Sequence, residues 1–250
     1  MKIIEFCGPP CSGKTFIKNL ILKNEKNFIN SDYLIYDYAN SYIELSNLEK
    51  LTLKYYKYLK FFKINKKSVN IIKKKTKKIN SNTFKKLKKN KLSFLFLKTY
   101  KNLCKKIFHL QMSENPKFFN LINYLLKKIK DKSKRNKIKE WYYETSAKYY
   151  IAKRINSNKT VVFDEGFAQR SIFFLNLKNN FKYNLEKYIS LSIKPNYLVF
   201  IDNKENLILK RSNNRLNKNL TSFTYKNLNE VKKYKSFFRN YLKIINNIKK

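Results

Sequence analysis

The sequence predicts an α/β fold with a mostly parallel sheet of four or five strands, covered by helices on both faces in a three-layer sandwich. Three observations favour this prediction. The runs 160–164 and 195–202 are short and largely apolar, as strands buried on both faces are. Longer segments with apolar side chains at helical spacing separate the strands, an alternation typical of parallel sheets. A glycine-containing loop joins the first expected strand to the first expected helix.

The first expected strand, residues 2–7, runs directly into the motif Gly-Pro-Pro-Cys-Ser-Gly-Lys-Thr, and residues 16–23 then show helical spacing. A complete G-x-x-x-x-G-K-S/T motif between a strand and a helix is typical of a loop that binds nucleotide phosphates. The expected ATP-binding residues are therefore the whole motif: Gly8, Pro9, Pro10, Cys11, Ser12, Gly13, Lys14 and Thr15. The alternative is an ordinary strand-turn-helix that contains the motif by chance.

Each part of the motif has a chemical role. Gly8 and Gly13 permit backbone conformations that a Cβ would block, so that N–H groups can point inward around an anion. The helix that follows adds unpaired N–H groups and the positive end of its dipole. Lys14 is expected to reach the β- and γ-phosphates, and Thr15 is expected to ligate Mg²⁺. The chain has only three glycines, and two of them lie in this motif.

The next part of the chain is expected to be mainly helical. Residues 28–32 are expected to end a second strand, which 33–37 continue. Approximately residues 40–156 are then expected to form the acceptor side and a closing cap within a single domain that spans 1–250. The helices expected in this region are 41–62, 91–110, 117–130 and 134–156.

The stretch 66–90 is the most strongly biased part of the chain. The whole chain has 57 Lys and Arg against 16 Asp and Glu, a formal charge of +41. Such a charge favours nucleic acid or an anionic membrane as a partner, and non-specific polyanion binding is expected at low salt. The alternative is genome composition, because Lys, Asn, Ile, Tyr and Phe share A/T-rich codons and are enriched together. Phe84 is the only aromatic residue in the stretch, so base stacking is poorly supported.

The last third of the chain alternates again. The strand 160–164 is followed by helices expected at 167–177 and 181–193, and the strand 195–202 by helices expected at 204–213 and 227–248. No clear further strand follows. Because ligands bind at the carboxyl ends of parallel strands, the residues directly after each strand are candidates for a site.

Composition also limits the class of protein. Cys7, Cys11 and Cys104 are too few and too scattered for a disulfide framework or a zinc site, which favours a cytoplasmic protein with reduced thiols. No apolar run reaches the roughly 18 residues of a transmembrane helix. The chain enters its first strand at once, so no signal peptide is expected. The oligomeric state is not indicated.

Asp164 and Glu165 follow an expected strand on the side where ligands bind. One of them could hold Mg²⁺ through water, or accept a proton from an acceptor hydroxyl, and the expected metal ligands are Thr15 and Asp164. The alternative for both acids is favourable placement at a helix N-terminus. Asp32 follows the second expected strand, where a cap or turn residue is the alternative to a substrate contact.

Arg170, Arg211 and Arg215 are half of the arginines in a chain that otherwise uses lysine. A planar guanidinium binds phosphate oxygens with two parallel hydrogen bonds, which lysine cannot do. Arg211 and Arg215 are four residues apart, so they share a helix face or bracket its end. We expect them to cover the transferring phosphoryl group. The alternative is a solvated surface.

Three segments resemble the P-loop nucleoside and nucleotide kinases, the superfamily that includes thymidylate kinase and the deoxynucleoside kinases. They are, in order, the motif at 8–15, Phe163-Asp-Glu-Gly-Phe-Ala-Gln-Arg170, and Pro195-Asn-Tyr-Leu-Val-Phe-Ile-Asp202 followed by Lys210-Arg211-Ser-Asn-Asn-Arg215. The resemblance implies the P-loop NTPase fold, ATP and Mg²⁺, and an acceptor contact or base near Asp32. Glu-Gly stands where these kinases carry Arg-Tyr or Arg-Ser after the acidic residue, which leaves the acceptor open.

The expected function is transfer of the γ-phosphoryl group of ATP to a small-molecule acceptor, a nucleoside, nucleotide, sugar or other metabolite. The expected catalytic residues are Lys14, Asp164, Glu165, Arg170, Arg211 and Arg215. Two alternatives remain. One is a P-loop ATPase that depends on nucleic acid, which the lysine-rich stretch favours. The other is an ATP-binding regulatory protein with weak turnover.

Overall fold

Four parallel strands form one sheet in the computed structural model, which describes residues 1–54, 91–175, 181–217 and 225–248. The strands are β1 (Lys2–Cys7), β2 (Phe28–Asn30), β3 (Thr160–Phe163) and β4 (Tyr197–Phe200). All three pairings are parallel, in the order β2-β3-β1-β4. The predicted α/β class and the parallel sheet are therefore confirmed, with the lower of the two expected strand numbers among the described residues.

The central strand β1 is paired on both sides. Its residue Ile4 lies opposite Val162 of β3 and opposite Tyr197 of β4. Because successive side chains of a strand point to opposite faces, Ile4 and Phe6 share one face of the sheet, while Ile3, Glu5 and Cys7 share the other. Each face has its own apolar cluster.

Helix α1 (Lys14–Asn24) begins directly after the loop and covers the Phe6 face. Its inner side chains Ile17 and Ile21 pack against a cluster built on Phe6 and Val162. The helix dipole therefore points its positive end at the loop that follows β1.

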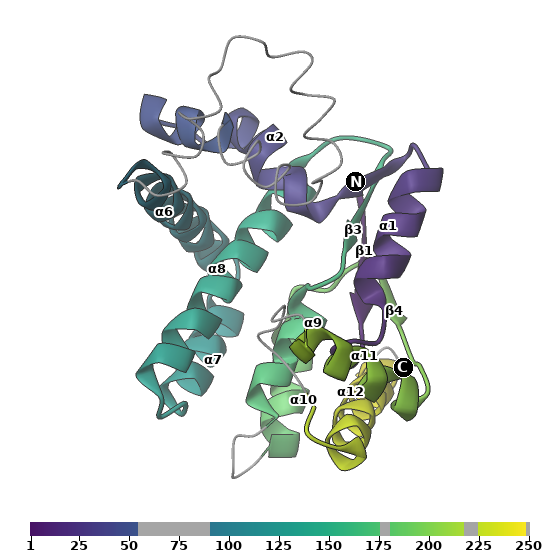
Figure 1. Ribbon diagram of the computed structural model, residues 1–250. Coiled ribbons are helices and arrows are strands. Elements are labelled where there is room, and N and C mark those ends of the chain that lie inside the picture. Colours follow the sequence, from purple (N-terminus) through teal and green to yellow (C-terminus); the bar gives the residue numbers. More distant parts are fainter. Residues whose placement is uncertain (55–90, 176–180, 218–224, 249–250) are drawn as a thin grey trace.

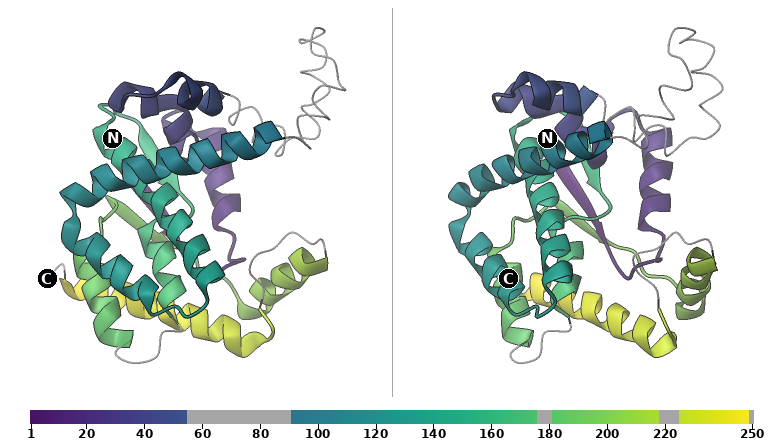
Figure 2. Two further views of the ribbon diagram at one scale, coloured as in Figure 1. Left: turned by 90° about the vertical axis from the view of Figure 1, so that its left-hand side faces the viewer. Right: turned by 60° about the vertical axis from the view of Figure 1, so that its left-hand side comes forward.

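The opposite face carries the main core, which is rich in aromatic rings. Phe163 of β3 contacts Tyr149, and the Phe167 ring lies 4.7 Å from the Tyr149 ring and 5.2 Å from the Phe118 ring, between ring centroids. These rings come from β3 and from three helices that pack together on this face (Figures 1 and 2). The α-helices that lie wholly within the described residues are, besides α1, α2 (Leu34–Tyr42), α6 (Lys91–Glu114), α7 (Pro116–Lys127), α8 (Lys132–Arg154), α9 (Phe167–Arg170), α10 (Phe181–Leu191), α11 (Glu205–Asn217) and α12 (Leu228–Ile248). The arrangement is compatible with a three-layer sandwich.

Two long helices, α6 and α8, lie against each other in the predicted acceptor-side region, and α2 also packs on α8. The sequence marks the starts of the following helices: Pro116 occupies the first turn of α7, and the Asp131 carboxylate caps α8 by accepting from the N–H of Lys134 at 3.0 Å. No helix among the described residues has the length and apolar character needed to cross a bilayer.

The structure corrects three of the expected elements. Residues 33–37 do not extend the second strand, because a 3-10 turn at Ser31–Tyr33 leads straight into α2. The expected helix 41–62 is interrupted at 43–46. Ser46 then starts a new helical segment through a capping box with Glu49, in which each side chain accepts a hydrogen bond from the other residue's N–H.

The third correction concerns the expected helix 167–177. It is a short α-helix that ends at Arg170 and continues as a 3-10 turn over Ser171–Phe174. The other expected helices are found within a few residues of their predicted bounds. The end of the expected helix 41–62 and the lysine-rich stretch 66–90 lie outside the described residues.

Candidate functional site

The loop after β1 holds three residues with positive φ: Gly8 at 147°, Cys11 at 66° and Gly13 at 106°. At Gly8 the reason for glycine is steric as well, because a Cβ there would lie 2.5 Å from the carbonyl oxygen of Ile201, just after β4. At Gly13 a Cβ would lie 3.2 Å from Nη1 of Arg211. The loop therefore needs its glycines both for its turn and for its tight seat at the end of the sheet.

Lys14 lies folded back over this loop. Its Nζ donates to the carbonyl oxygens of Gly8 and Pro9, both at 2.9 Å. Burial lowers its pKa to about 8, although nearby Glu165 acts in the opposite direction. Ser12 Oγ, in the same loop, is buried without a hydrogen-bond partner. A buried cation on a glycine loop, next to an unsatisfied hydroxyl, fits a bound phosphate group that would supply oxygen atoms to both.

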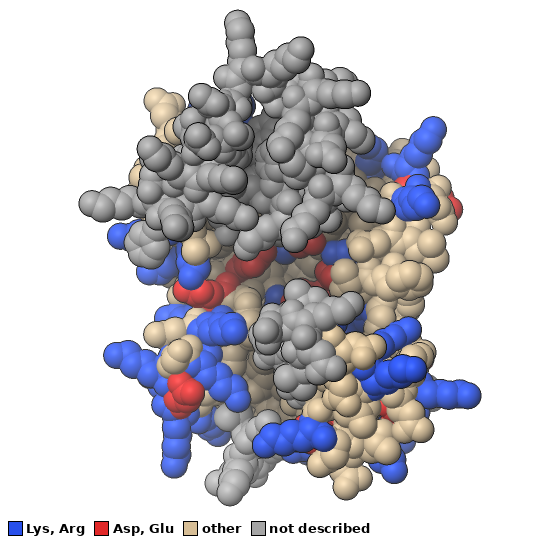
Figure 3. Space-filling view, in the orientation of Figure 1, with Lys and Arg blue, Asp and Glu red and all other residues tan. Residues whose placement is uncertain are grey.

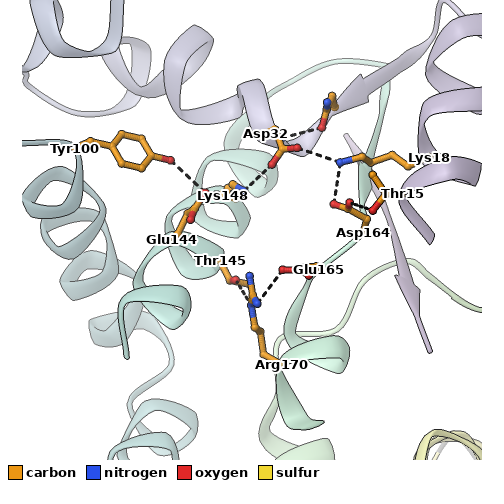
Figure 4. Close-up of polar contacts among 11 residues, drawn as sticks. Thr15, Lys18, Asp32, Tyr100, Glu144, Thr145, Lys148, Asp164, Glu165 and Arg170 are labelled. Atoms are coloured by element: carbon orange, nitrogen blue, oxygen red, sulfur yellow. Dashed lines mark hydrogen bonds and ion pairs between the residues drawn. The ribbon is translucent and has the colours of Figure 1, made fainter. Parts of the chain in front are cut away.

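Thr15, the last residue of the motif, contacts an acid that lies far away in the sequence. Its hydroxyl Oγ1 donates to Oδ2 of Asp164 at 2.9 Å, although the two residues are 149 positions apart in the chain (Figure 4). Asp164 is the residue directly after β3, so the parallel pairing of β1 and β3 brings the two groups to the same edge of the sheet.

The Thr15 hydroxyl and the Asp164 carboxylate are the hard oxygen ligands that Mg²⁺ takes when most of its other positions hold water and phosphate oxygens. Among the described residues there is no group of three or more His, Cys, Asp or Glu side chains arranged around a metal position. The residues present therefore fit a metal ion that is held largely by a bound nucleotide.

Asp32 lies close to Asp164 because both contact Lys18. The ammonium of Lys18 is 2.8 Å from Asp164 Oδ1 and 3.0 Å from Asp32 Oδ2. The other oxygen of Asp32 is 3.0 Å from the ammonium of Lys148, which also pairs with Glu144 at 2.9 Å. A row of alternating charges thus runs from α1 to α8, as Figure 4 shows.

Both lysines of this row remain protonated in spite of burial. Burial by itself lowers the pKa of Lys18, but Asp164 and Asp32 outweigh it and the pKa is raised. The same holds for Lys148, whose pKa is raised because Glu144 and Asp32 outweigh burial. The sequence analysis missed both residues, since single lysines carry no signal in a chain with a charge of +41.

Glu165 and Arg170 form an ion pair at 2.9 Å. The Arg170 side chain is held further by Thr145, whose hydroxyl accepts from its Nε at 3.3 Å, and by the Trp141 ring, whose centroid is 5.3 Å from the guanidinium carbon. Arg170 is therefore buried on the α8 side of the site, while the Glu165 side chain is about half exposed. Sequence reasoning selected both residues, and the structure brings them together near Asp164 (Figure 4).

The structure separates the two arginines of α11. Nη1 of Arg211 donates to the carbonyl oxygen of Ser12 at 3.3 Å, so it lies against the back of the loop. Arg215, one turn later, is exposed like Arg211, but no contact of its side chain with the loop is found among the described residues. The same Ser12 oxygen accepts a shorter bond of 2.6 Å from Nδ2 of Asn203, a residue just beyond β4 that the sequence analysis did not select. Lys235 of α12 in turn donates to the Asn203 carbonyl at 2.9 Å.

A buried acid, Glu5, lies beneath the loop. Its carboxylate accepts from the Tyr149 hydroxyl at 2.6 Å and from the N–H of Gln169 at 2.9 Å, and the Gln169 side chain accepts from the N–H of Gly8 at 3.1 Å. Burial raises the pKa of Glu5 to about 7, although the bonds from Tyr149 and Gln169 act in the opposite direction. A central-strand acid with this environment was also missed. Its signal was a lone Glu inside an otherwise apolar strand.

No family model, curated protein or solved structure matches this chain.

The site stands out electrostatically in the space-filling view. Figure 3 shows acidic side chains gathered in the hollow at the middle of this face, with Lys and Arg projecting around it. Asp32, Glu144, Asp164 and Glu165 are four of only 16 acids in the chain, yet they lie together at the ends of β2 and β3 and on α8. Next to them the loop offers N–H groups and Lys14. The arrangement can bind a polyphosphate at the loop and hold a hydroxyl-bearing molecule beside the carboxylates.

Proposed function

We propose that the protein is an ATP- and Mg²⁺-dependent phosphotransferase that transfers the γ-phosphoryl group to a small-molecule acceptor. The observation that carries the proposal is the hydrogen bond of 2.9 Å between the Thr15 hydroxyl and the Asp164 carboxylate. It joins the last residue of the phosphate-binding motif to an acid at the end of the neighbouring strand. A chance G-x-x-x-x-G-K-T motif would not require this second contact.

In the proposed reaction the loop binds the phosphates of ATP through its N–H groups and the α1 N-terminus. Lys14 leaves the carbonyls of Gly8 and Pro9 to contact phosphate oxygens, and Ser12 Oγ gains a partner. Thr15 and Asp164 would hold Mg²⁺, which when bound neutralises charge on the β- and γ-phosphate oxygens. The P-loop NTPase fold expected from the sequence is part of this proposal.

The acceptor is proposed to bind between the loop and α8. Asp32 is the candidate that accepts the proton of an attacking hydroxyl, since it lies beyond Asp164 as seen from the loop and is oriented by two lysines. Glu165 is the second candidate base. Its ion pair with Arg170 also places a guanidinium beside the path of the phosphoryl group, where it can balance developing charge. Arg211 is proposed to steady the loop, and Arg215 to cover the transferring phosphoryl group from α11.

Figure 3 also gives a specific reason to keep a second function in the test, because Lys and Arg side chains surround the hollow. A P-loop ATPase driven by nucleic acid would use such a surface to hold the phosphate backbone. The two functions differ in what accelerates loss of the γ-phosphate: a small acceptor for a kinase, and a nucleic acid for such an ATPase.

The test is a screen of nucleosides, nucleotides, sugars and other hydroxyl-bearing metabolites with γ-labelled ATP, with the ATPase rate measured in parallel with and without RNA or DNA. We expect label on a small acceptor, and its loss with Lys14→Met and with Asp164→Asn. A rate that rises severalfold with nucleic acid while no small acceptor is labelled would replace the kinase by the ATPase. Unchanged nucleotide binding by Lys14→Met would overturn both.

A further inference from the structure

Lys18 contacts two of the site's acids at once. It lies on α1 one helical turn after Lys14, and its side chain is 3% exposed. Its ammonium is 2.8 Å from Asp164 and 3.0 Å from Asp32 (Figure 4). Because both carboxylate oxygens lie within hydrogen-bond distance of one nitrogen, they are within about 6 Å of each other, where two like charges repel and a cation between them is stabilising.

The contacts of Asp164 are then shared between two neighbours. Oδ2 accepts from the Thr15 hydroxyl and Oδ1 accepts from the Lys18 ammonium. A divalent cation that approaches Thr15 therefore meets a carboxylate whose charge is already balanced in part by a lysine. Removing that lysine would leave more negative charge for the cation.

We propose that Lys18 is a positioning residue of the metal site, which holds Asp164 and Asp32 together and moderates how strongly Mg²⁺ is bound. Its ammonium holds Asp164, the proposed metal ligand, and Asp32, the proposed acceptor contact, at a fixed distance from each other. It also lowers the attraction of Asp164 for the metal. The inference rests on the proposed function, because it assigns Asp164 to the metal and Asp32 to the acceptor.

A second lysine of the row provides a matched control. Lys148 is also paired with two acids and also contacts Asp32 at 3.0 Å, but its other partner is Glu144 and not Asp164. Loss of Lys148 therefore disturbs the acceptor-side acid in a similar way while leaving the charge balance of Asp164 unchanged. Only Lys18 is expected to change the response to a metal.

The experiment measures the dissociation constant of a non-hydrolysable fluorescent ATP analogue in excess Mg²⁺ and in excess EDTA. The constant measured in EDTA divided by the constant measured in Mg²⁺ is a ratio that rises as the protein's own ligands couple metal to nucleotide more strongly, because the affinity of the free analogue for Mg²⁺ is common to all variants. We expect Lys18→Gln to raise this ratio at least about fivefold, and Lys148→Gln to leave it within about twofold of the wild type.

A second pair of variants provides the test if Lys18→Gln folds poorly, because that change removes one cation from Asp164 and one of the two lysines from Asp32. The same ratio is compared between Asp32→Asn and Asp32→Asn/Lys18→Gln, since the first change removes one of the two acids. The double variant is again expected to show the higher ratio.

The outcomes separate this inference from the function on which it rests. An unchanged or lower ratio in Lys18→Gln, or an equal rise in Lys148→Gln, would overturn the role of Lys18. Wild-type protein that does not bind the analogue in either condition would overturn the proposed function itself. Steady-state rates with the identified acceptor add a second readout: we expect Lys18→Gln to lower kcat without raising the KM for ATP.

Discussion

Gly166 packs directly on the carboxylate of Glu5. A Cβ built at residue 166 would lie 2.3 Å from Cδ and from Oε2 of that side chain. The φ of Gly166 is −96°, which any residue can adopt, so this glycine is required by the contact and not by its backbone conformation. Together with Gln169, the pair couples the start of α9 to the strand that leads into the phosphate-binding loop.

This contact leads to a prediction about Gly166→Ala. The added methyl group meets a buried side chain that is held on both sides by hydrogen bonds, so we expect a loss of about 2 kcal/mol in the free energy of unfolding. Chemical denaturation measures the loss. In a Glu5→Ala background the same substitution should cost clearly less, and a cost that is equal in both backgrounds would contradict the contact.

Glu5 also predicts a pH dependence of stability. Its pKa in the folded protein is about 7, against an ordinary value of 4.5, because burial disfavours the charged form. The folded state therefore binds this proton more tightly than the unfolded state does. Its contribution to the free energy of unfolding falls by about 3 kcal/mol in all as the pH rises from about 4.5 to about 7. Above that pH the contribution is constant.

Glu5→Gln tests this dependence, because the amide does not titrate, its oxygen can accept from the N–H of Gln169, and its NH₂ can donate to the Tyr149 oxygen. We expect the variant and the wild type to differ little at pH 5, and the variant to be the more stable of the two at pH 8. Urea unfolding at the two pH values provides the comparison. Parallel curves for the two proteins would mean that the Glu5 carboxyl is ionised throughout this range.

Lys14 predicts a pH dependence of nucleotide binding. Burial lowers its pKa to about 8 in the free loop, and phosphate oxygens favour the protonated form. Affinity for an ATP analogue should therefore be highest below pH 8 and fall up to about tenfold for each pH unit above it. Titrations between pH 7 and 9.5 measure this slope. Lys14→Met should bind weakly with no such slope, and a wild-type affinity that is constant over this range would contradict the assignment.

The two arginines of α11 test whether contact with the loop matters for nucleotide binding, because only one of them is seen to contact it. Arg211 donates to the Ser12 carbonyl, whereas Arg215 lies exposed one turn away. We expect Arg211→Ala to weaken binding of an ATP analogue about three- to tenfold, since a charged donor to the loop is lost. Arg215→Ala should leave this affinity unchanged and lower turnover only. Equal losses of affinity would mean that both arginines act on the bound nucleotide.

Substitution of Asn203 is expected to weaken nucleotide binding more than substitution of Arg211 does. The Asn203 bond to the Ser12 carbonyl is the shorter of the two, and Lys235 fixes the Asn203 backbone from α12. We expect Asn203→Ala to weaken binding of the analogue about tenfold, with a loss of stability of about 1 kcal/mol. Calorimetric titration and denaturation check the two values. Asn203→Asp is the companion variant, and it should be worse than alanine because a carboxylate would face the Ser12 carbonyl.

The fold class and half of the site followed from local patterns. The motif at 8–15 and the strand-end acid Asp164 were recognised because their positions in the chain imply that they meet at the edge of a parallel sheet. The break at 43–46 was missed although its signal, Ser46 followed three residues later by Glu49, is written in the sequence. The apolar spacing over 41–62 favoured one continuous helix, although the capping signal at Ser46 indicated the start of a second one.

The other half of the site depends on tertiary packing. Lys18, Lys148 and Asn203 belong to the commonest residue types of this chain, so nothing in the sequence separates them from solvated neighbours. What distinguishes them is contact with particular acids or carbonyl oxygens, which only the assembled helices determine. Arg211 and Arg215 were grouped by their spacing, but their distances to the loop depend on where α11 lies against the sheet.

The strand β4 ends the sheet, and among the described residues no further strand pairs with its outer edge. Tyr197 and Val199 on this strand are 52% and 37% exposed. An edge strand without a neighbour is a template for adding another chain, and a charge of +41 opposes the approach of identical copies. Conditions that mask this charge, such as high salt or a bound polyanion, remove the repulsion but not the edge. Self-association of the protein through β4 is therefore expected to depend on salt, because repulsion between lysines, and not the fold of the described residues, opposes it.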